Sequence, residues 1–144
     1  MGMRRGFVRA AGITGGAALT LALASCSLDT IIWGPDGAAV IDTTNRVIAA
    51  ASAGDATALV CAGAAPEMGA PEDWTGLAAE EPERLVGDHW PDQAALDAAW
   101  SINVSLPVDR VTGGTNAPGD LFFRDTDDGL CLVDVAWSTV EFEG

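Results

Sequence analysis

The segment VIAAASAGDATALVC, residues 47–61, contains the pattern that decides the predicted fold. Apolar residues recur at helical spacing in and before it, which is the pattern of a helix with one buried face. They are Val40, Ile41, Val47, Ile48 and Ala51. The spacing predicts a helix from about Ala38 to Ala53.

The residues that follow predict a tight corner. Gly54 can end the helix in the left-handed conformation, and the carboxylate of Asp55 can cap a second, short helix that runs through Cys61. These two helices would form an N-terminal helical hairpin.

The middle of the chain, residues 63–91, is rich in acidic residues and is interrupted by four prolines. We expect an exposed region with only short helical turns, near Glu72 to Leu77 and Pro82 to Val86. For Asp92 to Trp100 two alternatives remain: a helix that starts after Pro91, or the entry to a strand.

The last third predicts an antiparallel sheet. Apolar and polar residues alternate from Trp100 to Leu106, as in a half-buried strand. After a loop at 112–119, two apolar runs, 121–123 and 130–142, flank an Asp-Gly pair (Asp128-Gly129), which is a hairpin signal. Alternation in the final strand places four residues on one core-facing side: Cys131, Val133, Val135 and Trp137.

Two cysteines, Cys61 and Cys131, remain if Cys26 is modified. In an oxidising compartment such a pair indicates a disulfide, here one that would join the second helix to the sheet. The alternative is two buried free thiols. Two cysteines and one histidine are too few for a structural zinc site, and no cofactor is predicted.

The first 26 residues have the anatomy of an export signal. Three arginines precede an apolar stretch from Ala10 to Ala24, and small residues precede a cysteine. The apolar stretch is shorter than the roughly 20 residues of a membrane-spanning helix. Arg4-Arg5 with the residues after it resembles a twin-arginine signal, although a basic start is also typical of the general secretory route.

The tetrapeptide Leu23-Ala24-Ser25-Cys26 resembles the lipobox of bacterial lipoproteins. The resemblance implies cleavage between Ser25 and Cys26 and a diacylglyceryl group on the Cys26 thiol, which would anchor the chain at the extracytoplasmic face of the cell membrane. The alternative is an ordinary thiol beside a conventional cleavage site. The predicted organisation is a signal peptide (1–25), a lipidated Cys26 with a short spacer (26–36) and one acidic domain (37–144).

The helix, the Ala-Gly-Asp-Ala corner, the irregular middle and the closing sheet together resemble the NTF2-like family of α+β cone folds. Residues 47–61 carry most of this likeness. It implies an α+β domain in which the helical hairpin packs on a curved antiparallel sheet, sometimes with an apolar pocket. Fold likeness alone implies no activity.

The charge distribution excludes some partners. All 21 acidic residues follow Cys26, whereas three of the seven basic residues precede it, which leaves four arginines and a formal net charge of −17 in residues 26–144. Such a domain repels phosphate backbones and anionic lipid head groups, so nucleic acid is not an expected partner.

No set of residues predicts a catalytic site. His89 is the one imidazole and is interpreted as a surface residue of a proline-flanked loop. Asp125, Asp127 and Asp128 suit a hard cation but depart from an EF-hand loop, so no metal site is predicted. The five tryptophans (Trp33, Trp74, Trp90, Trp100 and Trp137) are interpreted mainly as core residues, and the acceptor-like motif at Asn103 is discounted because it lies in a predicted strand.

The resulting hypothesis is a non-catalytic envelope lipoprotein that binds a small apolar ligand or a protein partner. One alternative is a small pocket enzyme of isomerase or hydrolase type, which requires His89, Asp97 or Asp134 to line a cavity. Another is an accessory subunit of a membrane complex.

Overall fold

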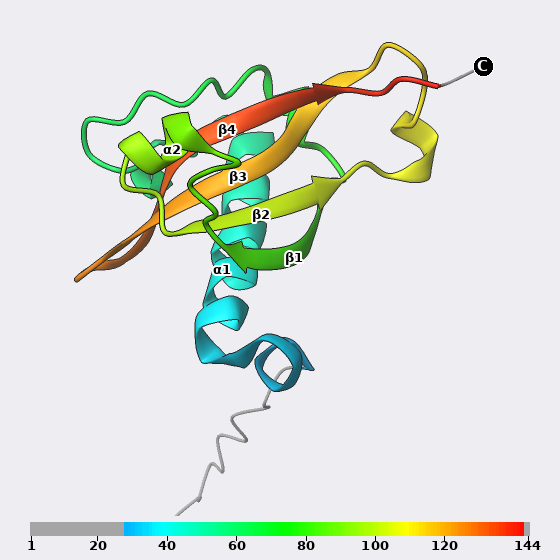
Figure 1. Ribbon diagram of the computed structural model, residues 1–144. Helices are drawn as coiled ribbons and strands as arrows, with labels where there is room; N and C mark the ends of the chain where they lie inside the picture. The colour runs from blue at the N-terminus through cyan, green and yellow to red at the C-terminus, as the bar shows by residue number, and fades with distance from the viewer. Residues whose placement is uncertain (1–27, 143–144) are drawn as a thin grey trace, which may run out of the picture.

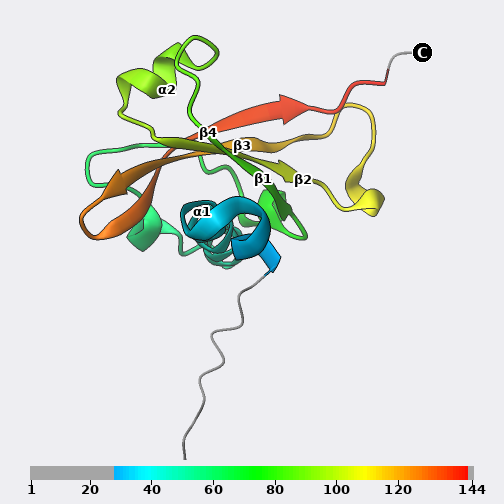
Figure 2. The same ribbon diagram turned by 60° about the horizontal axis from the view of Figure 1, so that its bottom comes forward.

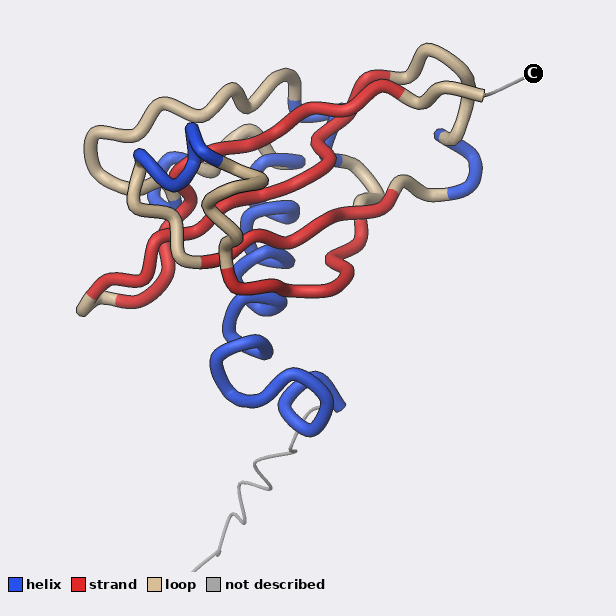
Figure 3. The backbone as a smooth tube through the Cα atoms, in the orientation of Figure 1, coloured by secondary structure: helices blue, strands red, loops and turns tan. Residues whose placement is uncertain are grey.

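The computed structural model describes residues 28–142 as one long helix packed on a four-stranded antiparallel sheet (Figures 1 and 3). The helices and 3-10 turns are α1 (Leu28–Ser52), η1 (Thr57–Leu59), η2 (Pro71–Trp74), α2 (Pro91–Ala95) and η3 (Val108–Arg110). The strands are β1 (Ala78–Arg84), β2 (Trp100–Ser105), β3 (Asn116–Thr126) and β4 (Gly129–Thr139). They lie in chain order, each antiparallel to the next. The α+β class and the antiparallel sheet are therefore confirmed.

Helix α1 begins earlier than predicted, at Leu28 rather than about Ala38. Gly34 breaks its helical geometry with a φ of 73° and a ψ of 174°, and Pro35 follows. A residue before proline is disfavoured in the helical conformation, which explains why the break falls there. Figure 1 shows the first turn, before this break, lying aside from the axis of the longer part of the helix.

The C-terminal end of α1 was predicted correctly. Gly54 adopts a φ of 75°, and its N–H donates to the carbonyl of Ala51 while the N–H of Asp55 donates to Ala50. This pair of hydrogen bonds satisfies carbonyls that the last helical turn leaves free.

The predicted second helix, 55–61, is wrong, and with it the helical hairpin. Only the 3-10 turn η1 forms there, and it has no side-chain cap from Asp55. The chain instead becomes extended, because Val60 forms a parallel bridge with Leu132 and the N–H of Cys61 donates to the Leu132 carbonyl at 2.9 Å. Pairing with the edge of β4 thus replaces the helix.

The middle of the chain is partly as predicted. The helical turn expected near Glu72 is η2. Of the two alternatives left open for Asp92 to Trp100, the helix after Pro91 forms, as α2. The turn expected at Pro82 to Val86 is wrong, since Pro82 lies in β1, an edge strand, where a proline needs no ladder partner on its open side. The loop expected at 112–119 ends earlier, because β3 begins at Asn116.

Both faces of the sheet are covered (Figure 2). One face packs against α1 and η2 and holds the main core, with Val40, Val47, Trp74, Leu121 and Phe123 almost fully buried. The opposite face holds a smaller core around Phe122 and Val133, which the connection 85–99 covers with α2. There the rings of Trp90 and Phe122 meet edge to face at 4.8 Å.

A bulge in β4 changes which residues share a face. Phe122 pairs with Asp134, whereas Phe123 pairs with Leu132, so Val133 is an extra residue. Such a bulge shifts the alternation of side chains. Cys131 and Val133 consequently pack in the smaller core, whereas Val135 and Trp137 pack on the α1 face. The predicted common face of these four residues is wrong.

Candidate functional site

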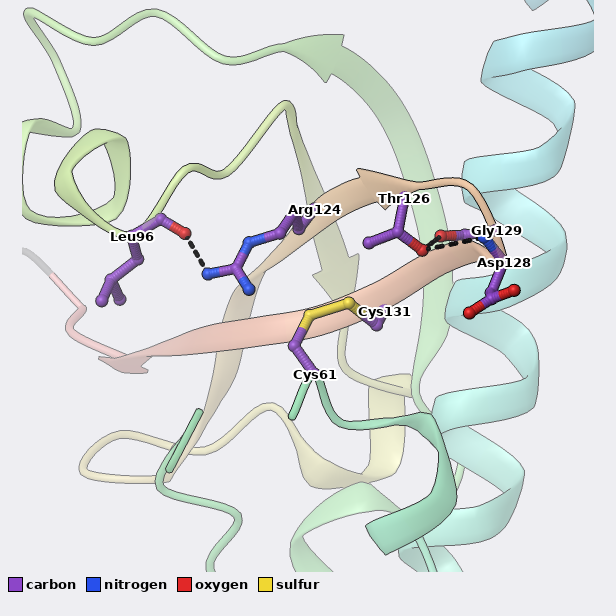
Figure 4. The surroundings of a disulfide bond; sticks show 7 residues. All are labelled: Cys61, Leu96, Arg124, Thr126, Asp128, Gly129 and Cys131. Carbon is purple, nitrogen blue, oxygen red and sulfur yellow. Dashed lines mark hydrogen bonds between the residues drawn. A yellow bond between two sulfur atoms is a disulfide. The ribbon is translucent and has the colours of Figure 1, made fainter. Parts of the chain in front are cut away.

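The disulfide between Cys61 and Cys131 is confirmed, with a Cα–Cα distance of 4.9 Å. It lies on the sheet face opposite α1 and joins the extended segment after η1 to β4 (Figure 4). The prediction that the disulfide joins a second helix to the sheet is wrong, because that helix does not form. Cys61 is buried and Cys131 is half-buried.

A pocket of about 420 Å³ borders this disulfide. Arg124 lines it, and its Nη2 donates to the carbonyl of Leu96 at 2.6 Å (Figure 4). The Nε of Arg124 is buried without a hydrogen-bond partner. The remaining lining comes mostly from Ala58 to Ala62 and from the hairpin end, residues 126–131.

The three acidic residues of the hairpin lie at an exposed turn. The Thr126 hydroxyl donates to the Gly129 carbonyl at 2.7 Å and accepts from the Asp128 N–H at 3.3 Å, so a side chain closes the turn. Asp125, Asp127 and Asp128 are all exposed. Among residues 28–142, no group of three or more His, Cys, Asp or Glu side chains is placed to hold a metal ion.

The residues required by the pocket-enzyme hypothesis do not come together. His89 and Asp97 are exposed, and Asp134 is half-buried and accepts a hydrogen bond of 2.8 Å from Gln93 of α2. None of the three lines either of the two pockets described here. The structure therefore places none of these three candidate residues at a described pocket.

The second pocket, which we call the apolar pocket, lies at the C-terminal end of α1 and has a volume of about 390 Å³. Small and apolar residues line it: Ala51, Gly54, Ala56, Thr57, Val60, Ala64, Ala65, Pro66, Met68, Gly69, Pro71 and Trp74. No lining side chain is titratable, and the polar groups among the lining side chains are the Thr57 hydroxyl and the Trp74 indole N–H. Such a lining suits an apolar group, and it contains no titratable side chain.

Two indoles fix the wall of the apolar pocket. The Trp74 Nε1–H donates to the Met68 carbonyl at 2.6 Å, and the Trp137 Nε1–H donates to the Glu67 carbonyl at 2.8 Å. A Cβ on Gly69, whose φ is 64°, would overlap the Trp137 ring. The loop 64–70 is therefore held at consecutive carbonyls and needs glycine where the indole crosses it.

Sequence reasoning did not locate the apolar pocket. The signal that points to it is the run AGAAPEMGAP, residues 62–71, whose small side chains leave space beside a large aromatic residue. The run has no helical or strand period. Its place beside α1 depends on hydrogen bonds from Trp74, six residues after Met68, and from Trp137, which is distant in sequence.

The remaining tryptophans differ in burial. Trp100 is 7% exposed in the core, and the guanidinium of Arg84 lies 4.0 Å from its ring centroid. Trp33 is 37% exposed on the first turn of α1, so it is not a core residue. Asn103 is exposed on β2, as predicted for a strand, and its Oδ1 accepts a hydrogen bond from the N–H of Glu81.

Asp120, on β3, has an unusual electrostatic environment. Partial burial raises the pKa of its carboxyl above the ordinary value of 3.8, and the nearby negative charge of Glu83 raises it further. Asp120 lines neither pocket.

The predicted cleavage and lipidation residues, Ser25 and Cys26, lie outside the described residues. Within residues 28–142, no helix has the length and apolar character needed to cross a membrane.

Comparison with known proteins adds no relative. The sequence matches no protein-family model, no curated protein and no solved structure.

Proposed function

We propose that the chain is a lipid-anchored lipoprotein of the extracytoplasmic face of the cell membrane. Its acidic domain would bind a small apolar ligand, or an apolar side chain of a protein partner, without catalysing a reaction. The observation that carries this proposal is the lining of the apolar pocket, which combines space for a ligand with an absence of titratable side chains.

The size and the walls of the apolar pocket support this function. Its volume of about 390 Å³ falls in the range of sites for small molecules. Its walls belong to α1 and to a loop that two indole hydrogen bonds hold in place, so the space exists before a ligand arrives. A preformed cavity lowers the ordering cost of binding.

The charge of the domain restricts the charge of the ligands that it could bind. With 21 acidic residues and four arginines after Cys26, the domain would disfavour an anionic ligand and nucleic acid. A neutral or cationic apolar group fits both the lining and the charge.

The lipobox supports the anchor part of the proposal. Residues 23–26 follow an apolar stretch of signal-peptide length, and more than one acyl chain on a cysteine gives stable attachment where one is marginal. The resemblance of the domain to the NTF2-like family stays a prediction. The order of helix, irregular middle and antiparallel sheet favours it, whereas η1 in place of a second helix weighs against it.

Binding of a neutral apolar dye tests the pocket. N-phenyl-1-naphthylamine should bind the protein saturably, with one site per chain and increased fluorescence. Ala65→Trp, which fills the pocket, should weaken binding by about tenfold or more, since each buried CH₂ contributes about 0.8 kcal/mol.

The matched control is Ala49→Trp, at an exposed position of α1 that does not line the pocket. It should leave dye affinity unchanged. Absence of saturable binding, or an equal loss in both variants, would exclude the apolar pocket as the binding site.

A further inference from the structure

In the first turn of α1, apolar side chains are exposed and polar ones are half-buried, which is the reverse of the usual arrangement. Leu28, Ile31 and Ile32 are 69%, 71% and 57% exposed, whereas Asp29 and Thr30 are half-buried. Positions 28, 31 and 32 share one helix face. Trp33, at 37% exposed, extends this apolar surface toward the break at Gly34.

The break at Gly34 and Pro35 sets the direction of this turn. Gly34 has a positive φ, and the backbone of Gly37 lies so close to Trp33 that a Cβ on Gly37 would be 2.6 Å from the Trp33 Cβ. Figures 1 and 2 show the turn at the end of the domain where α1 starts, away from the C-terminus. The side chains of Leu28, Ile31 and Ile32 therefore remain largely exposed at this end of the domain.

We propose that the surface of Leu28, Ile31, Ile32 and Trp33 inserts into the head-group region of the membrane to which Cys26 is anchored. This inference rests on the proposed lipidation of Cys26, and it adds a second, non-covalent contact between the domain and the lipid.

The distance along the chain favours lipid as the occupant. Leu28 follows Cys26 by two residues, so its Cα lies within about 7 Å of the acylated residue in any conformation. The head-group region on each side of a bilayer is about 5–7 Å thick, and a single helical turn is about 5 Å long. The turn must therefore lie in or directly above this region.

The chemistry of the turn also favours lipid over a protein partner. Branched aliphatic side chains with a flanking tryptophan are typical of surfaces that lie at the membrane interface. Residues 28–45 contain no basic residue, so contact would depend on apolar burial rather than on attraction to anionic head groups. Insertion should accordingly occur in neutral phosphatidylcholine vesicles and be insensitive to salt.

Insertion would also orient the domain. The apolar pocket lies at the opposite end of α1, about 27 Å along the helix from Pro35 at 1.5 Å per residue. A domain held both by the acyl chains and by the first turn would present the pocket away from the lipid surface, toward ligands in the aqueous phase or toward neighbouring proteins.

Spin labelling of the lipidated protein tests the inference. Ile31→Cys and Ile32→Cys would each carry the one free thiol of the mature chain, because Cys26 is acylated and Cys61 is bonded to Cys131. Ala49→Cys, exposed on the far half of the same helix, is the matched control. The proteins would be reconstituted in phosphatidylcholine vesicles and their accessibility to oxygen and to a water-soluble nickel complex compared.

Labels at residues 31 and 32 should lose most of their collisions with the nickel complex and gain collisions with oxygen, which concentrates in lipid. The label at residue 49 should stay accessible to nickel. If labels 31 and 32 lose contact with both reagents, a protein surface covers the turn and the inference is wrong.

Co-flotation of the same samples separates this inference from the proposed anchor. Protein that floats with vesicles while labels 31 and 32 remain as accessible to nickel as label 49 would overturn the insertion alone. Protein that does not float would overturn the anchor, and the insertion with it.

Discussion

The indole nitrogen of Trp137 on β4 donates a hydrogen bond of 2.8 Å to the backbone carbonyl of Glu67, seventy positions earlier in the chain. Together with the hydrogen bond from Trp74 to Met68, it holds the loop 64–70 that forms one wall of the apolar pocket. The last strand of the sheet therefore determines the shape of a pocket whose lining lies within residues 51–74.

Trp137→Phe should loosen this loop because phenylalanine keeps an aromatic ring but has no donor. We expect a loss of about 1 kcal/mol in the free energy of unfolding, faster amide hydrogen exchange in 64–70 and weaker dye binding. Trp33→Phe, outside the pocket, should change none of these. Unchanged exchange in 64–70 would show that the hydrogen bond does not hold the loop.

Gly69→Ala should destabilise the protein more than Gly63→Ala. Both glycines have a positive φ, 64° and 79°, so alanine at either costs about 1–2 kcal/mol. A Cβ at Gly63 meets nothing within 4 Å, whereas one at Gly69 overlaps the Trp137 ring and adds at least about 1 kcal/mol. Urea unfolding of the two variants measures the difference. Equal losses would contradict the close contact between Gly69 and Trp137.

Removing the disulfide should destabilise the domain strongly. Cys61 and Cys131 are 70 positions apart, for which the chain-entropy model gives a stabilisation of about 4 kcal/mol. The double variant Cys61→Ser, Cys131→Ser should unfold at correspondingly lower urea, as should the wild-type protein in reductant. A double variant as stable as the oxidised wild type would mean that strand pairing alone holds Val60 and Cys61 against β4.

Asp120→Asn should stabilise the protein at pH 7. Burial and Glu83 raise the folded-state pKa of Asp120, so the folded domain disfavours the charged form. Such a group contributes stability that is present below its unfolded pKa of about 4 and is lost as the pH rises through the raised pKa. The gain from Asp120→Asn should therefore disappear at low pH.

Unfolding measured across pH 3–8 tests the Asp120 prediction, with NMR titration of its carboxyl carbon as a direct check. Glu83→Gln should bring the Asp120 pKa partly back toward its ordinary value, because burial is the larger cause of the shift. An Asp120 carboxyl that titrates at or below the ordinary value would contradict this account.

Short-range patterns in the sequence predicted much of the fold. The apolar spacing of residues 40–51, the left-handed Gly54 and the Asp-Gly hairpin each depend on local chemistry, and the structure has all three. The disulfide followed from the count of cysteines once Cys26 was set aside.

The errors arose where distant contacts override local preference. The local sequence of Asp55 to Cys61 predicts a short helix. In the structure, Val60 and Cys61 pair with Leu132, so the end of this segment is extended. The bulge at Val133 reverses the face of every later side chain in β4, and alternation alone cannot locate a bulge. The apolar pocket was missed for the same reason, since its wall depends on Trp137.

The central claim is that lipid on Cys26 holds an acidic, apolar-pocket domain at the membrane, and the intact mass of the protein extracted from membranes tests it most directly. The account predicts the mass of residues 26–144 plus a diacylglyceryl group, with or without one further acyl chain. A chain that keeps residues 1–25, or one that starts at Cys26 with an unmodified thiol, would contradict it.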